Sequence, residues 1–433
     1  MLKGDIAPRP GGYFQFAFDN ADVNIRTLTG HGTFHSLGGI RFTTPAPTQN
    51  EQLIKREIEP PKSALTAERG SMPISWYQKS SSPGLRTIEV RRLRSTSIEA
   101  ILIAKEAVAL DSLCCAAMWA GMSSPPSWNG FMRKIYNARE GNFLRTQIDA
   151  LPFVNLNPGD PSSIYTALLY AETQCRLNNQ KSCLVTFDQP LYAKASEIVA
   201  SATGTELETV TVRLGGFHLL MSFLGCIGFF MAGSGIGELW QEVYAKVSVS
   251  HMLTGHAYSR AIRAHLLTER ALVTTILDYH TNDANEQVFE NLKSKIKTLL
   301  EDAFEGRLPP DTVSSDEVTK EFTKALERKM HSDLKVNGPT AELWLQYVSL
   351  VEIIRLFLRA ERTSNWELHL YTVERMLPYL HAAGHFNYAK SAHFYLQPMR
   401  ESDSRMLHEE FVKFMSDGFY SIRQNSNFWS CTS

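Results

Sequence analysis

The alternation of helix and strand patterns between residues 155 and 231 constrains the fold of this chain more than any other feature. The stretch "NPGDPSSIYTALLYAETQCRLNN" predicts a turn and then an amphipathic helix with Pro161 near its start. "KSCLVTFDQPLY" predicts a short apolar strand stopped by Pro190. A helix, a β-branched strand and a buried helix follow in "AKASEIVASA", "ELETVTVRLGGFH" and "LLMSFLGCIGFFM". Strands connected through helices pair in parallel by right-handed crossovers, so the sequence predicts an α/β fold.

Two earlier strand signals predict a second part of the same sheet. "YFQFAFD" (Tyr13 to Asp19) is a strand rich in aromatic residues, and "GTFHSLGGIRFTTP" predicts one or two short strands bent at Gly38 and Gly39. Together they indicate an antiparallel meander. Asp19 and Asp188 each end a predicted strand, where an aspartate either caps a turn or belongs to a functional site.

The remaining sequence predicts a division into strand-bearing and helical regions. Residues 46 to 96 are polar and rich in proline and serine, and a helical pattern starts at Ser97. After residue 238 almost only helical periodicity is present. We therefore expect the first strands at 1–45, a polar insertion and helix at 46–150, the remainder of the sheet at 151–237, a helical insertion at 238–360, and a returning helix with the C-terminal segment at 361–433.

The charge balance excludes a broadly basic surface. The chain has 44 lysines and arginines against 45 acidic residues, so any affinity for nucleic acid must come from a local patch. Arg260 and Arg263 lie within two turns of one predicted helix, in "LTGHAYSRAIRAHLLTERAL". They either follow a phosphate backbone or form a solvated helix face. His218 follows the "VTVRLGG" strand and either touches a phosphate or metal, or is a hydrogen-bonded core histidine.

Several motifs exclude other classes of protein. Six cysteines without a CxxC pair, and no signal peptide, predict reduced thiols in an intracellular protein. The uncharged span from Leu214 to Gly237 is interrupted by His218 and by glycines, so we expect a strand and a buried helix and no membrane segment. Its "GSGIG" lacks the context of a dinucleotide loop, and no small-molecule cofactor is expected. A metabolic enzyme that uses this glycine-rich region stays open as a third class.

Five motifs carry a resemblance to a known group of proteins. They are "FDNADVNIRTLTGHGTFH", "TFDQPLYAKASEI", "RLGGFHLLMSFLGCIGFFMAGSG", "MLTGHAYSRAIRAHLL" and "WELHL…HAAGHFNYAKSAHFYL". The chain resembles, from about Tyr13 to Trp429, uncharacterised proteins carried in many copies by animal mobile elements. That resemblance implies a DDE transposase with an RNase H-like mixed sheet core and a large all-helical insertion domain.

The resemblance also implies a metal site. Asp19 and Asp188 would be the first two members of a metal-binding triad for Mg²⁺ or Mn²⁺, with Asn20, Asp22 and Gln189 as neighbours. The third acid would be Glu367, with Glu374 and Glu361 as alternatives. The alternative interpretation is that all three of these glutamates are surface carboxylates on helices. A complete site would cut or join DNA strands.

The chain departs from that family at its end. After "DGFYSIRQNSNFW" family members continue through an acidic segment and a basic, glycine-rich tail, whereas this chain stops at "SCTS". We therefore expect a truncated copy that lacks a DNA-reading domain. The rival interpretation is a catalytically inactive relic that binds nucleic acid or protein partners. If DNA is the partner, we expect the protein in the nucleus.

Overall fold

The computed structural model describes residues 12–24, 33–45, 71–78, 89–137, 144–202, 206–279, 284–334, 337–402, 406–415 and 418–423. The chain forms two compact units. We call the first the sheet unit; it comprises Met1–Arg94, Leu144–His218 and Lys390–Asn425. We call the second the helical unit; it comprises Ser95–Phe143, Leu219–Ala389 and Ser426–Ser433. Most of the expected polar insertion at 46–96, and the C-terminal "SCTS", lie outside the described residues.

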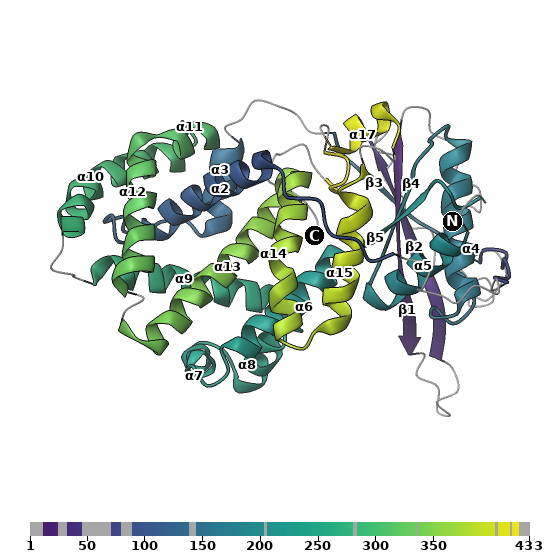
Figure 1. Cartoon of the computed structure of the whole chain (residues 1–433), viewed down its shortest axis with the longest axis horizontal. Helices are drawn as coiled ribbons and strands as arrows, with labels where there is room; N and C mark the ends of the chain where they lie inside the picture. Colours follow the sequence, from purple (N-terminus) through teal and green to yellow (C-terminus); the bar gives the residue numbers. More distant parts are fainter. Residues whose placement is uncertain are drawn as a thin grey trace, which may run out of the picture. The chain divides into compact units, whose positions relative to one another are not determined.

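A five-stranded mixed sheet forms the centre of the sheet unit (Figure 1). Its spatial order is β3-β2-β1-β4-β5. β1 pairs antiparallel with β2, and β2 pairs antiparallel with β3, which confirms the predicted meander. β4 is parallel to β1 and to β5, as the alternation of helices and strands predicts. The strands are β1 (Tyr13–Asn24), β2 (Thr33–Thr44), β3 (Gln147–Ala150), β4 (Cys183–Phe187) and β5 (Val210–Leu214).

One face of the sheet is buried under the helices that connect its parallel strands. α4 (Pro161–Leu177) and α5 (Gln189–Ser201) pack on this face (Figure 1). β1 contributes Phe14, Phe16 and Phe18, which are almost fully buried and, at every second position, share one side of the strand. Their removal from water supplies much of the unit's stability, because each buried aromatic side chain is worth about 2 kcal/mol.

The C-terminal segment packs on the other face of the sheet. α17 (His408–Met415) carries Phe414, and both Phe414 and Tyr420 lie within 6 Å of the guanidinium of Arg213 on β5. The side chain of Gln15 on β1 donates a hydrogen bond to the backbone carbonyl of Phe419. The carboxylate of Glu410 accepts hydrogen bonds from the backbone amides that precede β4. Residues from opposite ends of the sequence therefore complete one unit.

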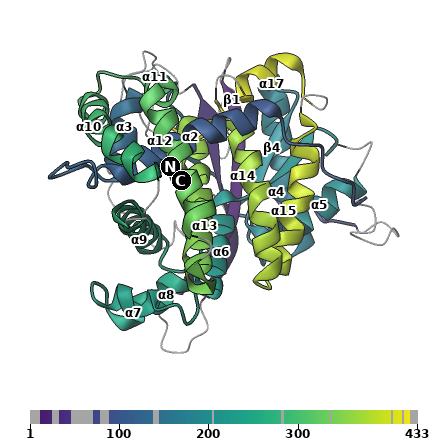
Figure 2. The same cartoon turned by 60° about the vertical axis from the view of Figure 1, so that its left-hand side comes forward.

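The helical unit is built around α2 (Ile98–Ala116), which packs against most of the other helices there (Figure 2). Ser97 caps this helix by accepting a hydrogen bond from the backbone amide of Ala100, at 3.1 Å, as its position before the helical pattern predicts. The other helices are α3 (Trp128–Asn137), α6 (Gly216–Phe230), α7 (Ile236–Gln241), α8 (Lys246–Leu253), α9 (Tyr258–Asp278), α10 (Ala284–Phe304), α11 (Pro310–Ser315), α12 (Glu317–Arg328), the π-helical turn η3 (Lys329–Leu334), α13 (Pro339–Thr363), α14 (Trp366–Ala382) and α15 (Phe386–Met399). The chain passes from the sheet unit to the helical unit within α6, after His218, and returns to the sheet unit within α15, at Lys390.

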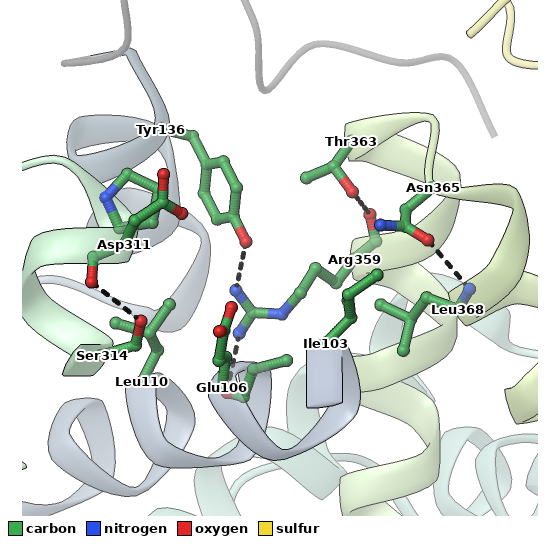
Figure 3. Close-up of a pocket in the computed structure, with 12 residues that line it drawn as sticks. Ile103, Glu106, Leu110, Tyr136, Asp311, Ser314, Arg359, Thr363, Asn365 and Leu368 are labelled. Carbon is green, nitrogen blue, oxygen red and sulfur yellow. Dashed lines mark hydrogen bonds between the residues drawn. The ribbon is translucent and has the colours of Figure 1, made fainter. Parts of the chain in front are cut away.

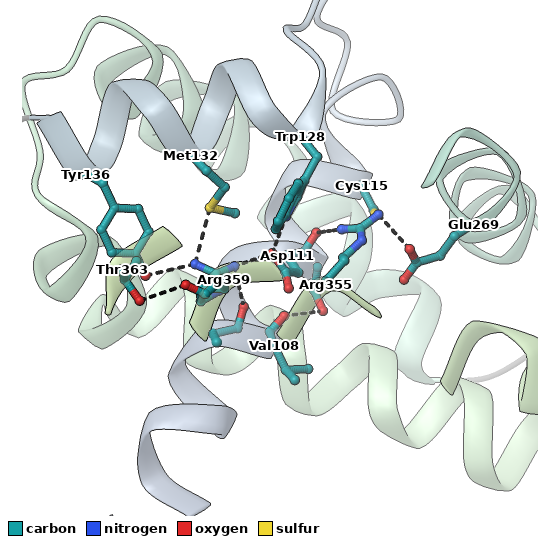
Figure 4. A network of polar contacts seen from close by, with 12 residues as sticks. Val108, Asp111, Cys115, Trp128, Met132, Tyr136, Glu269, Arg355, Arg359 and Thr363 are labelled. Carbon is teal, nitrogen blue, oxygen red and sulfur yellow. Dashed lines mark hydrogen bonds and ion pairs between the residues drawn. The ribbon is translucent and has the colours of Figure 1, made fainter. Parts of the chain in front are cut away.

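Two arginines of α13 lie fully inside the helical unit beside α2 (Figure 4). Arg359 forms an ion pair with Asp111 of α2, and the indole of Trp128 donates to the same carboxylate at 2.6 Å. Arg355 lies 2.7 Å from Glu269 of α9. Buried charges persist only when they are paired or hydrogen-bonded, so the Asp111 ion pair and the hydrogen bonds from Arg355 to Asp111 and Cys115 explain why arginines are tolerated in the core of the unit.

The glycines of α6 allow a loop to approach the helix closely. A Cβ atom at Gly228 would lie 1.9 Å from the carbonyl oxygen of Leu253, and one at Gly225 would lie 3.3 Å from that of Thr254. Gly255, with φ +80°, would meet the carbonyl of Met221 at 2.1 Å. The "GCIG" sequence is therefore required by packing, since a side chain at Gly228 has no room.

The structure divides the chain at other places than the sequence patterns suggested. Residues 95–143, grouped by the sequence with a polar insertion, belong to the helical unit because α2 and α3 bury their apolar residues there. The chain returns to the sheet unit at Lys390 and not at residue 361. Within the described part of the chain, no helix has the length and apolar character needed to cross a membrane.

Candidate functional site

Two aspartates occupy matching positions on adjacent parallel strands. The pairing of β1 with β4 ends with Phe18 opposite Phe187, and Asp19 and Asp188 are the next residue on each strand. The rings of Phe18 and Phe187 stack at 5.9 Å between centroids on the helix-covered face. Because side chains alternate along a strand, Asp19 points to the opposite face, on a strand about 4.8 Å from β4. Asp188 directly precedes α5 and directs its carboxylate to the backbone amide of Leu191. The two predicted site aspartates are thus neighbours.

The sequence places these aspartates differently in their strands. Asp188 follows β4 directly, as predicted, because Pro190 and the helix start interrupt the strand. β1 instead continues to Asn24, and Asp19 pairs with Gly38 of β2 inside the antiparallel ladder. The expected strand end at Asp19 is therefore corrected: only the pairing with β4 stops there. The side chain of Asp22 lies outside the described residues.

Asp188 is both a helix cap and a member of the acidic pair. Its carboxylate accepts a hydrogen bond from the backbone amide of Leu191, at 3.2 Å, which caps α5. Burial raises the pKa of Asp188, and the negative charge of Asp19 raises it further. The amide of Leu191 and the imidazole of His218 act in the opposite direction and are outweighed. A positive charge close to the pair would relieve this repulsion.

His218 joins the two aspartates from the third parallel strand. β5 ends at Leu214, and the amide of Gly215 donates to the carbonyl of Phe187 at 2.8 Å, so pairing with β4 continues past the strand. This contact fixes the start of α6 beside Asp188. The Nε2 atom of His218 lies 4.0 Å from the Oδ2 atom of Asp19. His218 is half exposed and so is not a core histidine, whereas its predicted contact with a phosphate or a metal stays a prediction.

A pocket of about 300 Å³ opens beside Asp188. Its lining combines residues from β1, β2, α5 and the loop that precedes α4: Asn20, His35, Asn157, Pro158, Gly159, Asp188, Pro190, Leu191 and Lys194. The ammonium group of Lys194 donates to the carbonyl of Gly159 at 2.6 Å. The "NPGD" turn is visible in the sequence, but its partner Lys194 lies 35 residues away, so no local pattern indicates its part in a pocket.

The acidic pair suits one hard cation better than a closed metal centre. Mg²⁺ is usually held by one or two carboxylates, with water and substrate phosphate completing its shell. Asp19 and Asp188 meet that need, and Asp19 is 62% exposed at the surface. Among the described residues there is no group of three or more His, Cys, Asp or Glu side chains arranged to hold a metal. The residues present therefore fit a cation whose remaining ligands come from solvent and substrate.

The proposed third acid belongs to the helical unit. The carboxylate of Glu367, in the first turn of α14, accepts a hydrogen bond from the hydroxyl of Ser97 at 2.9 Å. The alternatives also have partners in that unit: Glu361 lies 2.7 Å from the Nδ1 atom of His369, and Glu374 accepts a hydrogen bond from Thr96. Each carboxylate thus has a structural explanation within its own unit.

The predicted phosphate contacts Arg260 and Arg263 lie on the exposed face of α9. Arg260 donates to the hydroxyl of Ser248 at 3.2 Å. His265, on the other side of this helix, is fully buried and contacts the hydroxyl of Tyr347. The arginines therefore lie on a solvated face of the helical unit, and their contact with phosphate stays a prediction.

A smaller pocket, of about 140 Å³, surrounds Arg359 in the helical unit (Figure 3). The guanidinium of Arg359 donates to the hydroxyl of Tyr136 at 2.9 Å and to the carbonyl of Ala107, and Asp111 balances its charge. These contacts serve the folding of the helical unit. The pocket beside Asp188 is the better candidate for a functional site because it adjoins the acidic pair.

Fold and site together define a mixed α/β protein with a five-stranded sheet, a helical unit and a polar site where β4 and β5 end and the pairing of β1 with β4 stops. A family model described as a domain of unknown function (DUF8702) matches residues 127–433. The chain belongs to this family. The match includes Asp188, His218 and Glu367, whereas Asp19 precedes it. Neither the curated proteins nor the solved structures contain a match to the chain.

Proposed function

We propose that the sheet unit is the RNase H-like core of a protein derived from a DDE transposase, and that it acts on DNA through a divalent cation held by Asp19 and Asp188. The observation that carries this proposal is the position of the two aspartates on adjacent parallel strands. The sheet order β3-β2-β1-β4-β5, with three antiparallel strands followed by two parallel ones, supports it because this is the arrangement expected of that fold.

The chemistry follows from what the side chains can do. A divalent cation would lower the repulsion that raises the pKa of Asp188, and it would supply activation of a water or hydroxyl for phosphodiester cleavage. His218, 4.0 Å from Asp19, is placed to hold the Asp19 carboxylate in position. For strand cleavage and transfer, Glu367 is the proposed third ligand.

A second candidate function is binding of nucleic acid without cleavage. The chain re-enters the sheet unit at Lys390, and α15 has the sequence "FNYAKSAHFYLQPM", which contains no carboxylate. In its place Ser391 accepts a hydrogen bond from Gln189, next to Asp188, at 3.1 Å. Together with the contact between Glu367 and Ser97, this observation favours a core that retains two acids and has lost the third.

Calorimetric titration with Mn²⁺ tests the proposal. We expect the wild type to bind Mn²⁺ and the double variant Asp19→Asn, Asp188→Asn to lose binding. The matched control is Glu208→Gln with Glu409→Gln, which removes two exposed carboxylates from the same unit. No binding by the wild type, or equal binding by the Asp19 and Asp188 variant, would rule the cation site out. A nuclease assay on a labelled duplex then separates cleavage from binding alone.

A further inference from the structure

The pocket beside Asp188 is shaped for a ligand larger than a cation. Its volume of about 300 Å³ lies at the lower end of the range for pockets that hold small organic ligands, roughly 300 to 1,000 Å³. One wall is formed by Asp188, so a molecule in the pocket lies next to one carboxylate of the acidic pair. A nucleotide unit has about the size that this pocket accepts, whereas a bare phosphate would leave most of it empty.

Lys194 supplies a fixed positive charge to this pocket. An ammonium group has three N–H donors, and one of them is directed to the carbonyl of Gly159 at 2.6 Å. That hydrogen bond ties the side chain of α5 to the loop before α4. The loop is itself anchored, since the hydroxyl of Ser163 donates to the carbonyl of Asn157 at 2.7 Å. The charge is thus held at the pocket by a preformed loop.

The remaining walls offer both polar and apolar contacts. Asn20 and Asn157 provide side-chain amides, which can donate to and accept from a base edge or a sugar hydroxyl. Pro158, Pro190 and Leu191 provide the apolar surface against which a sugar or a base can pack. Such a combination of one cation, two amides and an apolar wall matches the parts of a nucleotide.

We infer that the pocket of Lys194, Asn157 and Asn20 binds one nucleotide of a nucleic-acid strand whose neighbouring phosphate lies at Asp19 and Asp188. This inference rests on the proposed function. It adds the position of the bound strand and names the residue that contacts the phosphate backbone of that strand. Lys194 contacts a phosphate oxygen of the bound strand, and the prolines support its sugar and base. The strand therefore runs from the acidic pair, at the N-terminal end of α5, along the first turns of this helix toward Lys194.

Fluorescence anisotropy with a labelled single-stranded DNA oligonucleotide, in Ca²⁺ so that binding is measured without cleavage, tests the inference. Lys194→Ala should weaken binding about tenfold and should lower the salt dependence of binding by about one phosphate contact, a slope change of about 0.7. Gly159→Ala keeps the charge but places a Cβ atom 3.1 Å from the Lys194 ammonium, which must move. We expect it to give an intermediate loss.

Lys181→Ala is the matched control. Lys181 is exposed and lies at the other end of β4, where only its backbone amide is used, so its loss should leave affinity within about twofold. The inference is wrong if Lys194→Ala binds the oligonucleotide with wild-type affinity, or if the wild type does not bind it at all. Mn²⁺ titration of Lys194→Ala distinguishes the two proposals. If the variant still binds Mn²⁺ but has lost affinity for DNA, both the cation site and the nucleotide pocket are supported. If it still binds both Mn²⁺ and DNA, only the cation site is supported.

Discussion

Glu410 and Ser182 are joined by two hydrogen bonds although 228 residues separate them in the sequence. Both the backbone amide and the hydroxyl of Ser182 donate to one carboxylate oxygen, and the amide of Lys181 donates to the other at 2.6 Å. Ser182 immediately precedes β4, and Glu410 lies in the first turn of α17. A single carboxylate therefore fastens the C-terminal helix to the start of the strand that ends at Asp188.

We expect Glu410→Gln to destabilise the sheet unit by about 2 to 3 kcal/mol. An amide offers one acceptor oxygen where the carboxylate offers two, and hydrogen bonds to a charged group are worth about 1.5 to 3 kcal/mol. Urea unfolding measured by circular dichroism gives the value. Glu409→Gln, one residue earlier on the exposed side, should change stability by less than about 0.5 kcal/mol, and similar losses in both variants would contradict the assignment.

Gly228→Ala should be among the most damaging substitutions in the helical unit, at about 3 kcal/mol or more. Its Cβ would lie 1.9 Å from the carbonyl oxygen of Leu253, so the C-terminal end of α8 must separate from α6. In an unhindered helix the same change would stabilise by about 1 kcal/mol. Gly237→Ala is the comparison, because its Cβ would meet Leu253 only at 3.7 Å. Thermal unfolding of both variants tests this prediction. Equal melting temperatures would refute the close approach of Leu253 to Gly228.

Glu269 should make the stability of the helical unit fall as pH rises. Burial raises its pKa to about 8; Arg355 opposes the shift, while Asp111 and Glu352 add to it. The native state then holds a proton that the unfolded chain releases. The contribution of Glu269 to the free energy of unfolding is therefore complete below about pH 4.5 and is lost as the pH rises to about 8. The slope reaches at most about 1.4 kcal/mol per pH unit. Unfolding of Glu269→Gln across pH 5 to 9 should lack this component, and parallel curves would disprove it.

Glu367→Gln should leave Mn²⁺ binding unchanged within about twofold. Two carboxylates suffice for a first Mg²⁺ or Mn²⁺ ion, and Glu367 is already hydrogen-bonded to Ser97. Loss of that bond should cost about 1 kcal/mol in thermal unfolding. A strong loss of Mn²⁺ binding would instead show that Glu367 is a ligand of the first cation. In the cleavage candidate, the variant keeps the cation and loses strand cutting.

Local patterns predicted the acidic pair because its causes are local. β4 ends at Phe187 because Asp188 caps α5 and Pro190 lies in the first turn of that helix, and the alternation of helices and strands predicted which strands run parallel. The length of β1 could not be predicted, since its extension past Asp19 depends on pairing with β2. Lys194 and Gly159 were missed for the same reason: neither residue is distinctive until α5 and the loop before α4 come together.

The assignment of α2 shows the limit of periodicity. Its apolar residues, from Ile98 to Ala116, are distributed around the whole helix, because helices pack on it from several sides. Such a pattern indicates a buried helix but does not say which unit buries it. The pairing of Asp111 with Arg359, 248 residues apart, is what places α2 in the helical unit, and no local pattern encodes it.

The sheet unit is assembled from three stretches of chain that enclose the helical unit in sequence. During synthesis the ribosome therefore releases β1 first, yet Glu410 and Phe419 emerge only after all of α2 to α15 has been made. The helical unit can complete its core while the sheet still exposes the face that α17 will cover. Translation order thus favours a folding sequence in which the first strands of the chain are among the last to be sealed from solvent.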